Sequence, residues 1–425
     1  TRSSATTGWY ARPGSAAGAA SATAGWSWGP EVEAALWDLA ALLVRWAHLI
    51  FGIAWIGASF YFIWLDNSLQ APPAHKAEAG VAGDLWSFHG GGIYEVSKYR
   101  GAPPAMPGRL HWFYWEAYST WLSGFLLLCV VYYLQAPTLL AGEGTWIPGP
   151  GAAVVASVVL LAAGVAVYEA LLRSPLGGRQ GVFAGVMVAF TALACWLAFQ
   201  LFAPRAAALH VGMLLGTIMA GNVFLGIIPA QRAFVRSLES GGEPPLAGLA
   251  QAKLRSTHNN YFTLPVLLCM ISNHYPVLYG HRAAPLVLFL LLALAAFARH
   301  FFNLRHRGIV RPSILVLAFA GFLAVAGWLA WDGSRAVADV GGARLSDGEA
   351  LALVETHCTV CHAQAPSWPG MAAAPLGLEL ETLAAVDAAA ARAATALGTG
   401  YMPLGNVTAM ADEERAALLA WLRDR

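Results

Sequence analysis

Charged residues are scarce in this chain. Only 12% of its 425 residues are Asp, Glu, Lys or Arg, and the formal net charge is +1. Soluble domains carry about 25% charged residues, roughly twice as many. Basic residues gather in no stripe or long run, so the chain lacks the electrostatic footprint of a nucleic-acid-binding protein. The shortage of charge argues against a soluble domain and against a nucleic-acid partner.

Cysteine is also scarce, with five residues in the whole chain. Three of these cysteines stand singly in apolar runs, where a small buried thiol is the usual interpretation: Cys129, Cys195 and Cys269. The chain has no second closely spaced cysteine pair beside Cys358 and Cys361, and no His-x-x-x-His near them. A zinc site is therefore a poor interpretation of this pair.

Cys358 and Cys361 belong to the run C-T-V-C-H, which ends at His362. This spacing is typical of covalent attachment of a c-type haem. The two thiols bind the haem vinyl groups, and the adjacent histidine reaches the iron from one side. The run therefore predicts one covalently bound haem c and a role in electron transfer.

Hydrophobic residues, in contrast, are abundant and make up 58% of the chain. They form blocks of about 20 residues, the length that crosses a bilayer as a helix. The 17 Trp and 13 Tyr suit the aromatic belts at the two membrane surfaces. We expect about eight transmembrane helices, near residues 37–64, 112–134, 151–172, 181–203, 206–228, 258–279, 284–303 and 312–331. A short surface helix is expected at Ala247–Arg255.

The basic residues provide a test of this topology. Haem c is attached on the outer side of a bacterial-type membrane, so an even number of spans places both termini outside. Thirteen basic residues then lie in inner loops, against two in the outer loops, Arg205 and Arg282. This asymmetry follows the positive-inside rule. The inner residues are Lys76, Lys98, Arg100, Arg109, Arg173, Arg179, Arg232, Arg236, Lys253, Arg255, Arg305, Arg307 and Arg311.

Composition divides the chain into four segments. Residues 1–34 are rich in Ala, Gly, Ser and Thr, and we expect a flexible tail rather than a cleavable signal peptide. Residues 35–331 form the membrane domain, residues 332–344 a polar linker, and residues 345–425 a small C-terminal domain. The fold class is thus all-α, a polytopic helix bundle followed by a domain like a small class I cytochrome c.

The C-terminal domain carries two helix signals. Ser346 and Glu349 have the spacing of a capping box and predict a helix that ends at the haem motif. A second helix is expected at about Asp412–Arg423. The second iron ligand is expected to be a methionine, and the candidates are Met371, Met402 and Met410. Met402 is favoured because Pro403 stiffens its loop, about 40 residues after the motif. The predicted iron ligands are therefore His362 and Met402.

Polar residues within the expected spans are the candidates for catalysis, since such residues are costly in a membrane and usually functional. Any one of them can equally be a structural hydrogen-bonding group. The candidates are His48, His210 and His274 toward the outer side, and His111, Glu116, His258 and Asn259 toward the inner side. The same polar set includes Arg45 on the outer side and Glu169, Asn222, Asn260 and His300 on the inner side. The three outer histidines fall at similar depths, which leaves open a second haem or metal in the membrane. His48 and His274 lie nearest the haem side.

Several longer motifs occur along the chain. They are L-V-R-W-A-H-L-I-F-G-I-A-W-I-G-A-S-F-Y-F (Leu43–Phe62), H-G-G-G-I-Y-E-V-S-K-Y (His89–Tyr99), L-H-W-F-Y-W-E-A-Y-S-T-W-L-S-G-F (Leu110–Phe125), H-N-N-Y-F-T-L-P-V-L (His258–Leu267), I-S-N-H-Y-P (Ile271–Pro276), the C-x-x-C-H run and M-P-L-G-N (Met402–Asn406). Together these motifs resemble a known family, the bacterial membrane-bound urate oxidases (urate hydroxylases) that carry a cytochrome c domain. The resemblance covers roughly residues 37–425.

The resemblance implies oxidation of urate to 5-hydroxyisourate, with electrons passing through haem c to a downstream cytochrome or terminal oxidase. It implies a multi-pass protein of the bacterial inner membrane, with the cytochrome domain on the periplasmic side. Two other classes of function remain open. A respiratory subunit would oxidise quinol or carry a membrane haem b, and its haem would be reduced without urate. A transporter with an attached cytochrome would move substrate with no haem reduction.

Overall fold

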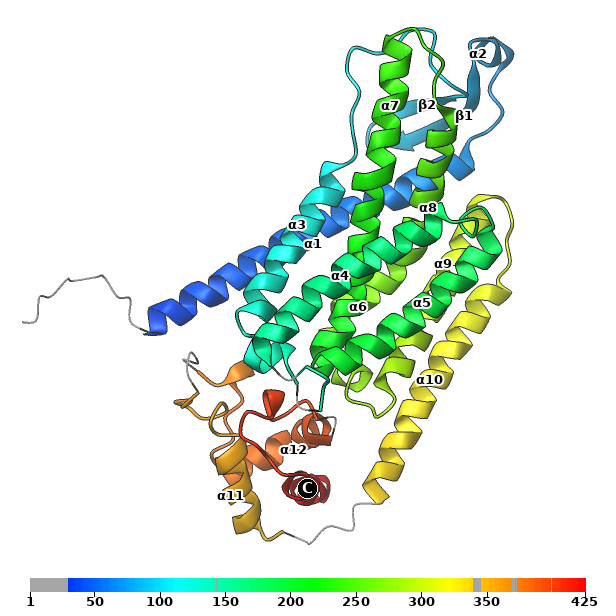
Figure 1. The fold of residues 1–425 in the computed structure, drawn as a ribbon. Helices are drawn as coiled ribbons and strands as arrows, with labels where there is room; N and C mark the ends of the chain where they lie inside the picture. Colours follow the sequence, from blue (N-terminus) through cyan, green and yellow to red (C-terminus); the bar gives the residue numbers. More distant parts are fainter. Residues whose placement is uncertain are drawn as a thin grey trace, which may run out of the picture.

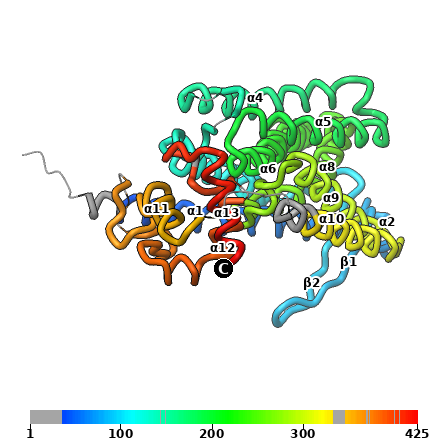
Figure 2. Tube along the Cα trace, turned by 90° about the horizontal axis from the view of Figure 1, so that it is seen from below, coloured from blue at the N-terminus to red at the C-terminus, as the bar shows by residue number. Residues whose placement is uncertain are grey.

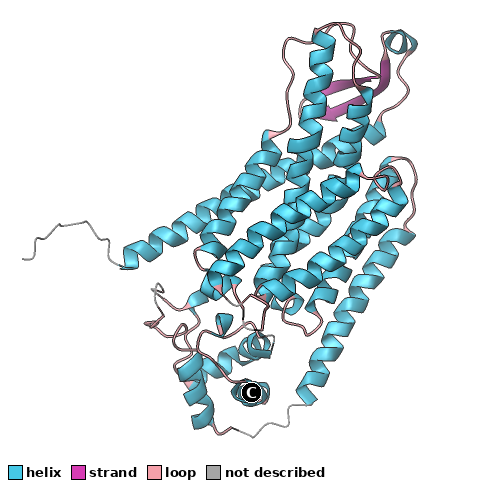
Figure 3. Cartoon of the chain, viewed as in Figure 1, coloured by secondary structure: helices cyan, strands magenta, loops and turns pink. Residues whose placement is uncertain are grey.

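The computed structural model describes residues 30–142, 144–147, 149–338, 345–368, 371, 373–398 and 400–425. Within these ranges the chain is mostly helical (Figure 3). A long helical bundle, residues 30–338, carries a small C-terminal domain, residues 345–425, at one end (Figure 1). Most of the tail expected at residues 1–34 lies outside the described residues, and so do residues 339–344 of the expected linker.

The N-terminal part of the bundle is built from α1 (Pro30–Ser68) and α3 (Trp115–Leu128). These two helices pack along one another. After Leu128 the chain continues in π-helical turns, η1 (Cys129–Tyr133) and η2 (Ala136–Leu140). The expected span near 112–134 is therefore one helix of mixed type.

The connection between α1 and α3 contains a short helix, α2 (Ala74–Glu78), and an antiparallel hairpin of β1 (Val81–His89) and β2 (Gly92–Tyr99). The hairpin turns at Gly90, whose φ of 59° is a conformation that glycine adopts without strain. His89 pairs with Gly92 at this tip. The motif around His89 is therefore a hairpin turn at the end of the bundle opposite the C-terminal domain (Figure 1).

The remaining bundle helices run back and forth along its length (Figure 1). They are α4 (Pro150–Arg173), α5 (Gln180–Leu201), α6 (Pro204–Gly221), the π-helical η3 (Asn222–Ile227), α7 (Ile228–Glu239), α8 (Leu246–Ile271), α9 (Ala284–His306) and α10 (Ser313–Ala338). Helix α6 contacts α3, α4, α5, α8 and α9 and provides much of the core. Many outward side chains on α1, α4, α5 and α10 are apolar, which suits a lipid environment.

Each of the eight expected spans contains a helix. Six helices in the described ranges are long and apolar enough to cross a membrane, and α3 and α8 are not among them. α3 is only 14 residues long, and the first half of α8 is polar. The count of eight spans therefore stays a prediction. The prediction of a separate surface helix at Ala247–Arg255 was wrong, because these residues form the first turns of α8. Helix α8 ends at Ile271 and is followed by two short 3₁₀ turns, η4 (Ser272–His274) and η5 (Pro276–Leu278).

The C-terminal domain contains α11 (Asp347–His357), α12 (Leu383–Gly398) and α13 (Asp412–Arg423), grouped together in Figure 2. The predicted capping box at Ser346 is confirmed, and the bounds of α13 agree with the prediction. Helix α12 was not predicted. The three helices share a separate apolar core, and the Trp421 indole donates to Asp347 Oδ1 at 3.2 Å.

Candidate functional site

The most connected polar network of the bundle centres on Arg255 of α8. Its guanidinium pairs with Glu169 of α4, with Nη2 2.9 Å from Oε2 and Nη1 bound to Oε1. Arg173 adds a second cation 3.1 Å from the same carboxylate. Nη1 of Arg255 also donates to Asn222 Oδ1 at 2.8 Å. The buried charges of Arg255 and Glu169 are therefore matched by each other and by hydrogen bonds, as buried ions require.

The network continues from Asn222 to two of the predicted candidates. Asn222 Nδ2 donates to Asn259 Oδ1 at 2.8 Å and to the Tyr168 hydroxyl at 3.0 Å. The Tyr168 hydroxyl lies 2.7 Å from His258 Nδ1, and the His258 ring stacks on Phe183. Because Tyr168 accepts from Asn222, its proton is free to be donated to His258. A chain of hydrogen bonds thus joins Glu169 to an imidazole that can exchange a proton.

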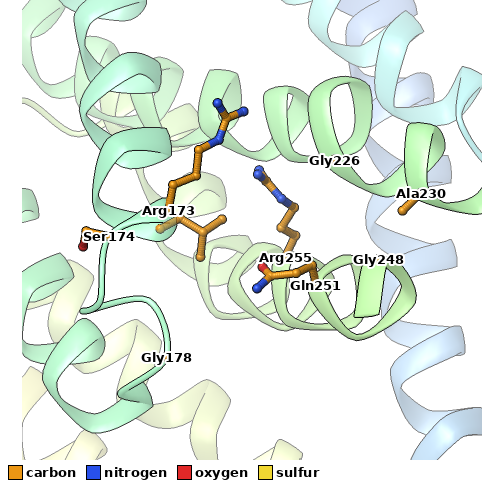
Figure 4. A pocket seen from close by; sticks show the side chains of 9 residues that line it. Arg173, Ser174, Gly178, Gly226, Ala230, Gly248, Gln251 and Arg255 are labelled. Atoms are coloured by element: carbon orange, nitrogen blue, oxygen red, sulfur yellow. The ribbon is translucent and has the colours of Figure 1, made fainter. Parts of the chain in front are cut away.

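A pocket of about 440 Å³ borders this network. Figure 4 shows Arg173 and Ser174 on one side and Arg255 and Gln251 of α8 on the other. Gly226 lies against Arg255, and a Cβ at Gly226 would stand 2.3 Å from Arg255 Cδ. Only glycine therefore leaves room for the Arg255 side chain here. The pocket is large enough for a purine, but its arginines already share the Glu169 carboxylate.

A second polar cluster lies where α1, α8 and α9 meet. Arg299 of α9 is 4% exposed, and its Nε donates to Asn260 Oδ1 at 3.0 Å. The guanidinium carbon lies 3.9 Å from the centroid of the Phe60 ring. Arg299 Nη2 and Asn260 Nδ2 are buried and have no hydrogen-bond partner among the described residues. Within the described part of the chain, this cluster, unlike the first, holds buried donors without an acceptor.

His48 of α1 faces α3. Its Nδ1 lies 3.0 Å from the Thr120 carbonyl and 3.1 Å from the Ser123 hydroxyl. Gly124 allows this approach, because a Cβ there would come within 2.8 Å of His48 Cε1. These contacts give His48 a helix-joining role.

His210 of α6 is completely buried. Its Nδ1 donates to the Ala206 carbonyl at 2.7 Å, so its Nε2 accepts from the Ser157 hydroxyl, also at 2.7 Å. The ring stacks on Phe202. With both nitrogens engaged, His210 has no free lone pair for a metal in this arrangement.

The other candidates are dispersed. His274 and His111 are exposed, and His111 makes an edge contact with Phe113. Glu116 is half-buried at the start of α3, and its Oε2 has no partner among the residues described. Of the predicted catalytic residues, only His258 and Asn259 are joined in one network. No cluster of three or more His, Cys, Asp or Glu side chains with metal-binding spacing occurs in the described ranges.

Cys358, Cys361 and His362 follow directly after α11. Both thiols are free and half-buried, and burial raises the pKa of Cys358 to about 11. His362 Nδ1 donates to the Leu378 carbonyl at 2.9 Å, which leaves Nε2 unprotonated and able to bind a metal. The three side chains therefore have the chemistry that haem attachment requires.

The methionines of the C-terminal domain differ in their surroundings. Met410 is 3% exposed and belongs to the domain core. Met402 is half-buried on a loop, and its backbone is held at both ends. Its N–H donates to the Ala396 carbonyl at 3.1 Å, and its carbonyl accepts from Arg415. Met371 is half-buried. Met402 thus combines a backbone fixed by hydrogen bonds with a side chain outside the core, which suits an iron ligand.

Sequence reasoning missed three residues of these clusters. Arg255 was counted only as a basic loop residue, and Tyr168 was not distinguished from other aromatics. Arg299 was overlooked although it lies within the expected span 284–303. A lone arginine between apolar residues of a span is itself a signal of function.

Comparison with known families identifies the bundle. Residues 34–330 match the family model described as urate oxidase N-terminal, which covers well over half of the chain. The chain belongs to the urate oxidase N-terminal family. No curated protein and no solved structure matches the chain. The matched region contains both polar clusters of the bundle and ends before the C-terminal domain. The urate oxidase N-terminal family relates the chain to urate oxidation, and the C-terminal domain is an addition beyond the matched residues.

Proposed function

We propose that this chain is a membrane-bound urate oxidase that converts urate to 5-hydroxyisourate and delivers the electrons to a haem c on its C-terminal domain. The observation that carries the proposal is the union, in one chain, of the family match over residues 34–330 with the C-x-x-C-H run at Cys358–His362. The first relates the bundle to urate oxidation. The second supplies an electron acceptor for that reaction.

The residues of the C-terminal domain fit a haem c. Cys358 and Cys361 provide the thiols, and His362 is oriented by its bond to the Leu378 carbonyl. Met402 would be the second ligand, because its loop is held by backbone hydrogen bonds while Met410 is committed to the core. A haem held by histidine and methionine supplies one-electron transfer and leaves no open iron site for a substrate. Substrate binding therefore belongs to the bundle.

The proposed reaction balances without oxygen reduction at the site. The urate anion and one water molecule yield 5-hydroxyisourate, one proton and two electrons. The water oxygen forms the new bond to the purine, and a base must take up the released proton as the two electrons leave. A haem c held by these residues would supply one-electron transfer, so each urate would require two successive transfers. The downstream acceptor is a cytochrome or terminal oxidase.

The proposed setting is the bacterial inner membrane, with eight spans and the C-terminal domain on the periplasmic side. Six long apolar helices support a membrane location. The hairpin of β1 and β2 and the tips of α7 and α8 lie at the end away from the C-terminal domain (Figure 1). Lys98 and Lys253, which both pair with Asp66, belong to this far end. A basic far end suits the cytoplasmic face.

The function is tested with the purified, haem-loaded protein in lipid nanodiscs, supplied with urate and an oxidised soluble cytochrome under anaerobic conditions. We expect urate loss, 5-hydroxyisourate formation and reduction of two equivalents of cytochrome for each urate. The control is Cys358→Ser with Cys361→Ser, which has the bundle but no thiols for haem attachment. Turnover by the control equal to that of the parent would contradict the role of the C-terminal domain. Reduction by quinol with no response to urate would favour the respiratory subunit instead.

A further inference from the structure

We infer that the urate anion binds where α1, α8 and α9 meet, at Arg299 and Asn260. This inference rests on the proposed function and adds the location of the substrate. It depends on a buried cation that has no counter-ion among the described residues, on neighbouring donors that have no partner there, and on a row of polar atoms that leads away from the cation.

Among the described residues, nothing compensates the charge of Arg299. The side chain is 4% exposed, and no ion pair joins it to a carboxylate in the described part of the chain. An isolated buried charge is expensive, and proteins normally pair such charges. The Asn260 carbonyl and the face of Phe60 lower this cost, but neither carries a negative charge. A bound anion would supply the missing charge.

The free hydrogen-bonding atoms match a purine. Nine buried side-chain atoms in the described ranges lack a partner, and four of them belong to Asn260, Arg299, Asn303 and His306. Asn260 Nδ2 and Arg299 Nη2 are donors, Asn303 Oδ1 is an acceptor, and His306 Nδ1 can be either. Urate carries carbonyl acceptors and ring N–H donors around its edge. A mixed set of free donors and acceptors is what such a ligand needs.

The polar atoms follow one face of α9. Arg299, Asn303 and His306 are spaced i, i+4 and i+7, which places them along the same side of a helix. This side continues to the end of α9 that lies away from the C-terminal domain (Figure 1). The row therefore links the buried Arg299 to the far end of the bundle, the proposed cytoplasmic face.

Neighbouring contacts hold Arg299 in place. Tyr261 follows Asn260 on α8, and His300 follows Arg299 on α9. The Tyr261 hydroxyl lies 2.7 Å from His300 Nδ1, so a second hydrogen bond joins the two helices beside the Asn260–Arg299 pair. Phe60 of α1 closes over the guanidinium. These contacts fix α8, α9 and α1 around the free donors, so the binding groups are positioned before the ligand arrives.

The Arg255 pocket is the weaker alternative. Its arginine is bonded on both terminal nitrogens, to Glu169 and Asn222, and Arg173 shares the same carboxylate. An anion there would compete with an existing ion pair. The two arginines therefore differ in their partners: Arg255 is paired with the Glu169 carboxylate, and Arg299 is paired with no carboxylate among the described residues.

The experiment measures urate binding by the shift in thermal unfolding of the full chain in nanodiscs, a readout that does not depend on turnover. Ligands that bind the folded state raise the unfolding temperature with concentration. Urate is the probe, and uncharged hypoxanthine is the control ligand. We expect urate to stabilise the parent and Arg299→Gln to weaken urate binding at least tenfold. Arg299→Lys keeps the charge but not the planar fork and should lie between them.

Two controls separate binding from folding. Arg232→Gln removes an exposed cation of α7 and should bind urate like the parent. Without ligand, Arg299→Gln should unfold at or above the parent temperature, because removal of a buried charge with no partner carboxylate in the described ranges offsets the lost hydrogen bond to Asn260. Parent-like urate binding by Arg299→Gln would overturn the inference and leave the proposed function standing. Urate binding that depends on Arg299, without any urate oxidation, would overturn the proposed function alone. A parent protein that does not bind urate would overturn both.

Discussion

Arg205 of α6 donates a hydrogen bond from Nη1 to the Tyr401 hydroxyl at 3.2 Å. The two residues are 196 positions apart, and the bond joins the bundle to the loop that carries Met402. The Arg205 guanidinium also lies 5.9 Å from the centroid of the Tyr401 ring, and Tyr279 packs edge-on against the same ring at 5.9 Å. The C-terminal domain is thus docked on the bundle beside its proposed ligand loop.

Removal of this docking contact should slow electron delivery without changing the haem. For Arg205→Ala we expect a several-fold slower urate-dependent haem reduction and a loss of about 1.5–3 kcal/mol in stability, the range for a hydrogen bond to a charged group. Stopped-flow absorbance measures the rate. Tyr401→Phe, which keeps the ring packed on Tyr279, should lose less. Parent rates in both variants would show that docking does not limit transfer.

Met402 is the next residue to test, through the haem spectrum. Met402→Ala should replace a low-spin spectrum with one from an iron with an open coordination site. Met410→Leu is the matched control, since it keeps the volume of a core methionine and should cost less than about 1.5 kcal/mol. An unchanged spectrum in Met402→Ala would eliminate this residue as the ligand.

The patterns that predicted structure well were local ones. The capping box at Ser346 and the apolar positions of α13 depend on neighbours three or four residues away, so the sequence displays them directly. Helix α12 was missed although its alanine-rich run favours a helix. The hairpin of β1 and β2 was missed because the glycines around residue 90 indicated a loop, although two strands of nine and eight residues flank them.

The candidate site was harder to predict, since it depends on which residues of distant helices meet. His48 and His210 resemble ligands in sequence, yet hydrogen bonds to Thr120, Ser157 and Ala206 occupy them. Arg255 and Arg299 look alike in sequence, and only the position of Glu169 on another helix distinguishes a paired cation from an unpaired one. Spacing along one helix carries no information of this kind.

The Glu169–Arg255 pair should be structural. Glu169→Gln leaves the Arg255 charge buried without a full counter-ion, and we expect a loss of about 3–5 kcal/mol, as for other broken buried pairs. Thermal unfolding in nanodiscs measures this loss. The double variant Glu169→Gln with Arg255→Gln should lose less than the sum of the single variants, because the two residues interact. Strict additivity would show that the pair contributes no coupling.

His210 should likewise affect stability rather than substrate. His210→Phe leaves the Ser157 hydroxyl without its acceptor, and we expect a loss of about 1–3 kcal/mol. The concentration of urate needed for half-maximal thermal stabilisation should stay at the parent value. If a folded His210→Phe protein bound urate tenfold more weakly, His210 would again be a candidate residue of the substrate site.

The hairpin should be sensitive to acid. The hydrogen bond from Lys76 lowers the pKa of the Asp84 carboxyl below its usual value, so the charged form is favoured in the folded state. This contribution to stability is present above the unfolded pKa of about 3.9 and is lost as pH falls through the lower folded pKa. Pepsin cleavage within residues 81–99 should rise over this range. In Lys76→Met the rise should begin at higher pH, and an unchanged profile would exclude the ion pair as its cause.

The central claim is that urate bound in the bundle reduces a haem on the C-terminal domain. The most direct measurement is stopped-flow absorbance of the oxidised, fully haem-loaded protein mixed with urate under anaerobic conditions. The account predicts conversion of the ferric to the ferrous spectrum, with a rate that depends on urate concentration and is at least tenfold lower in Arg299→Gln at subsaturating urate. A ferric spectrum that urate leaves unchanged, in protein that dithionite reduces fully, would contradict it.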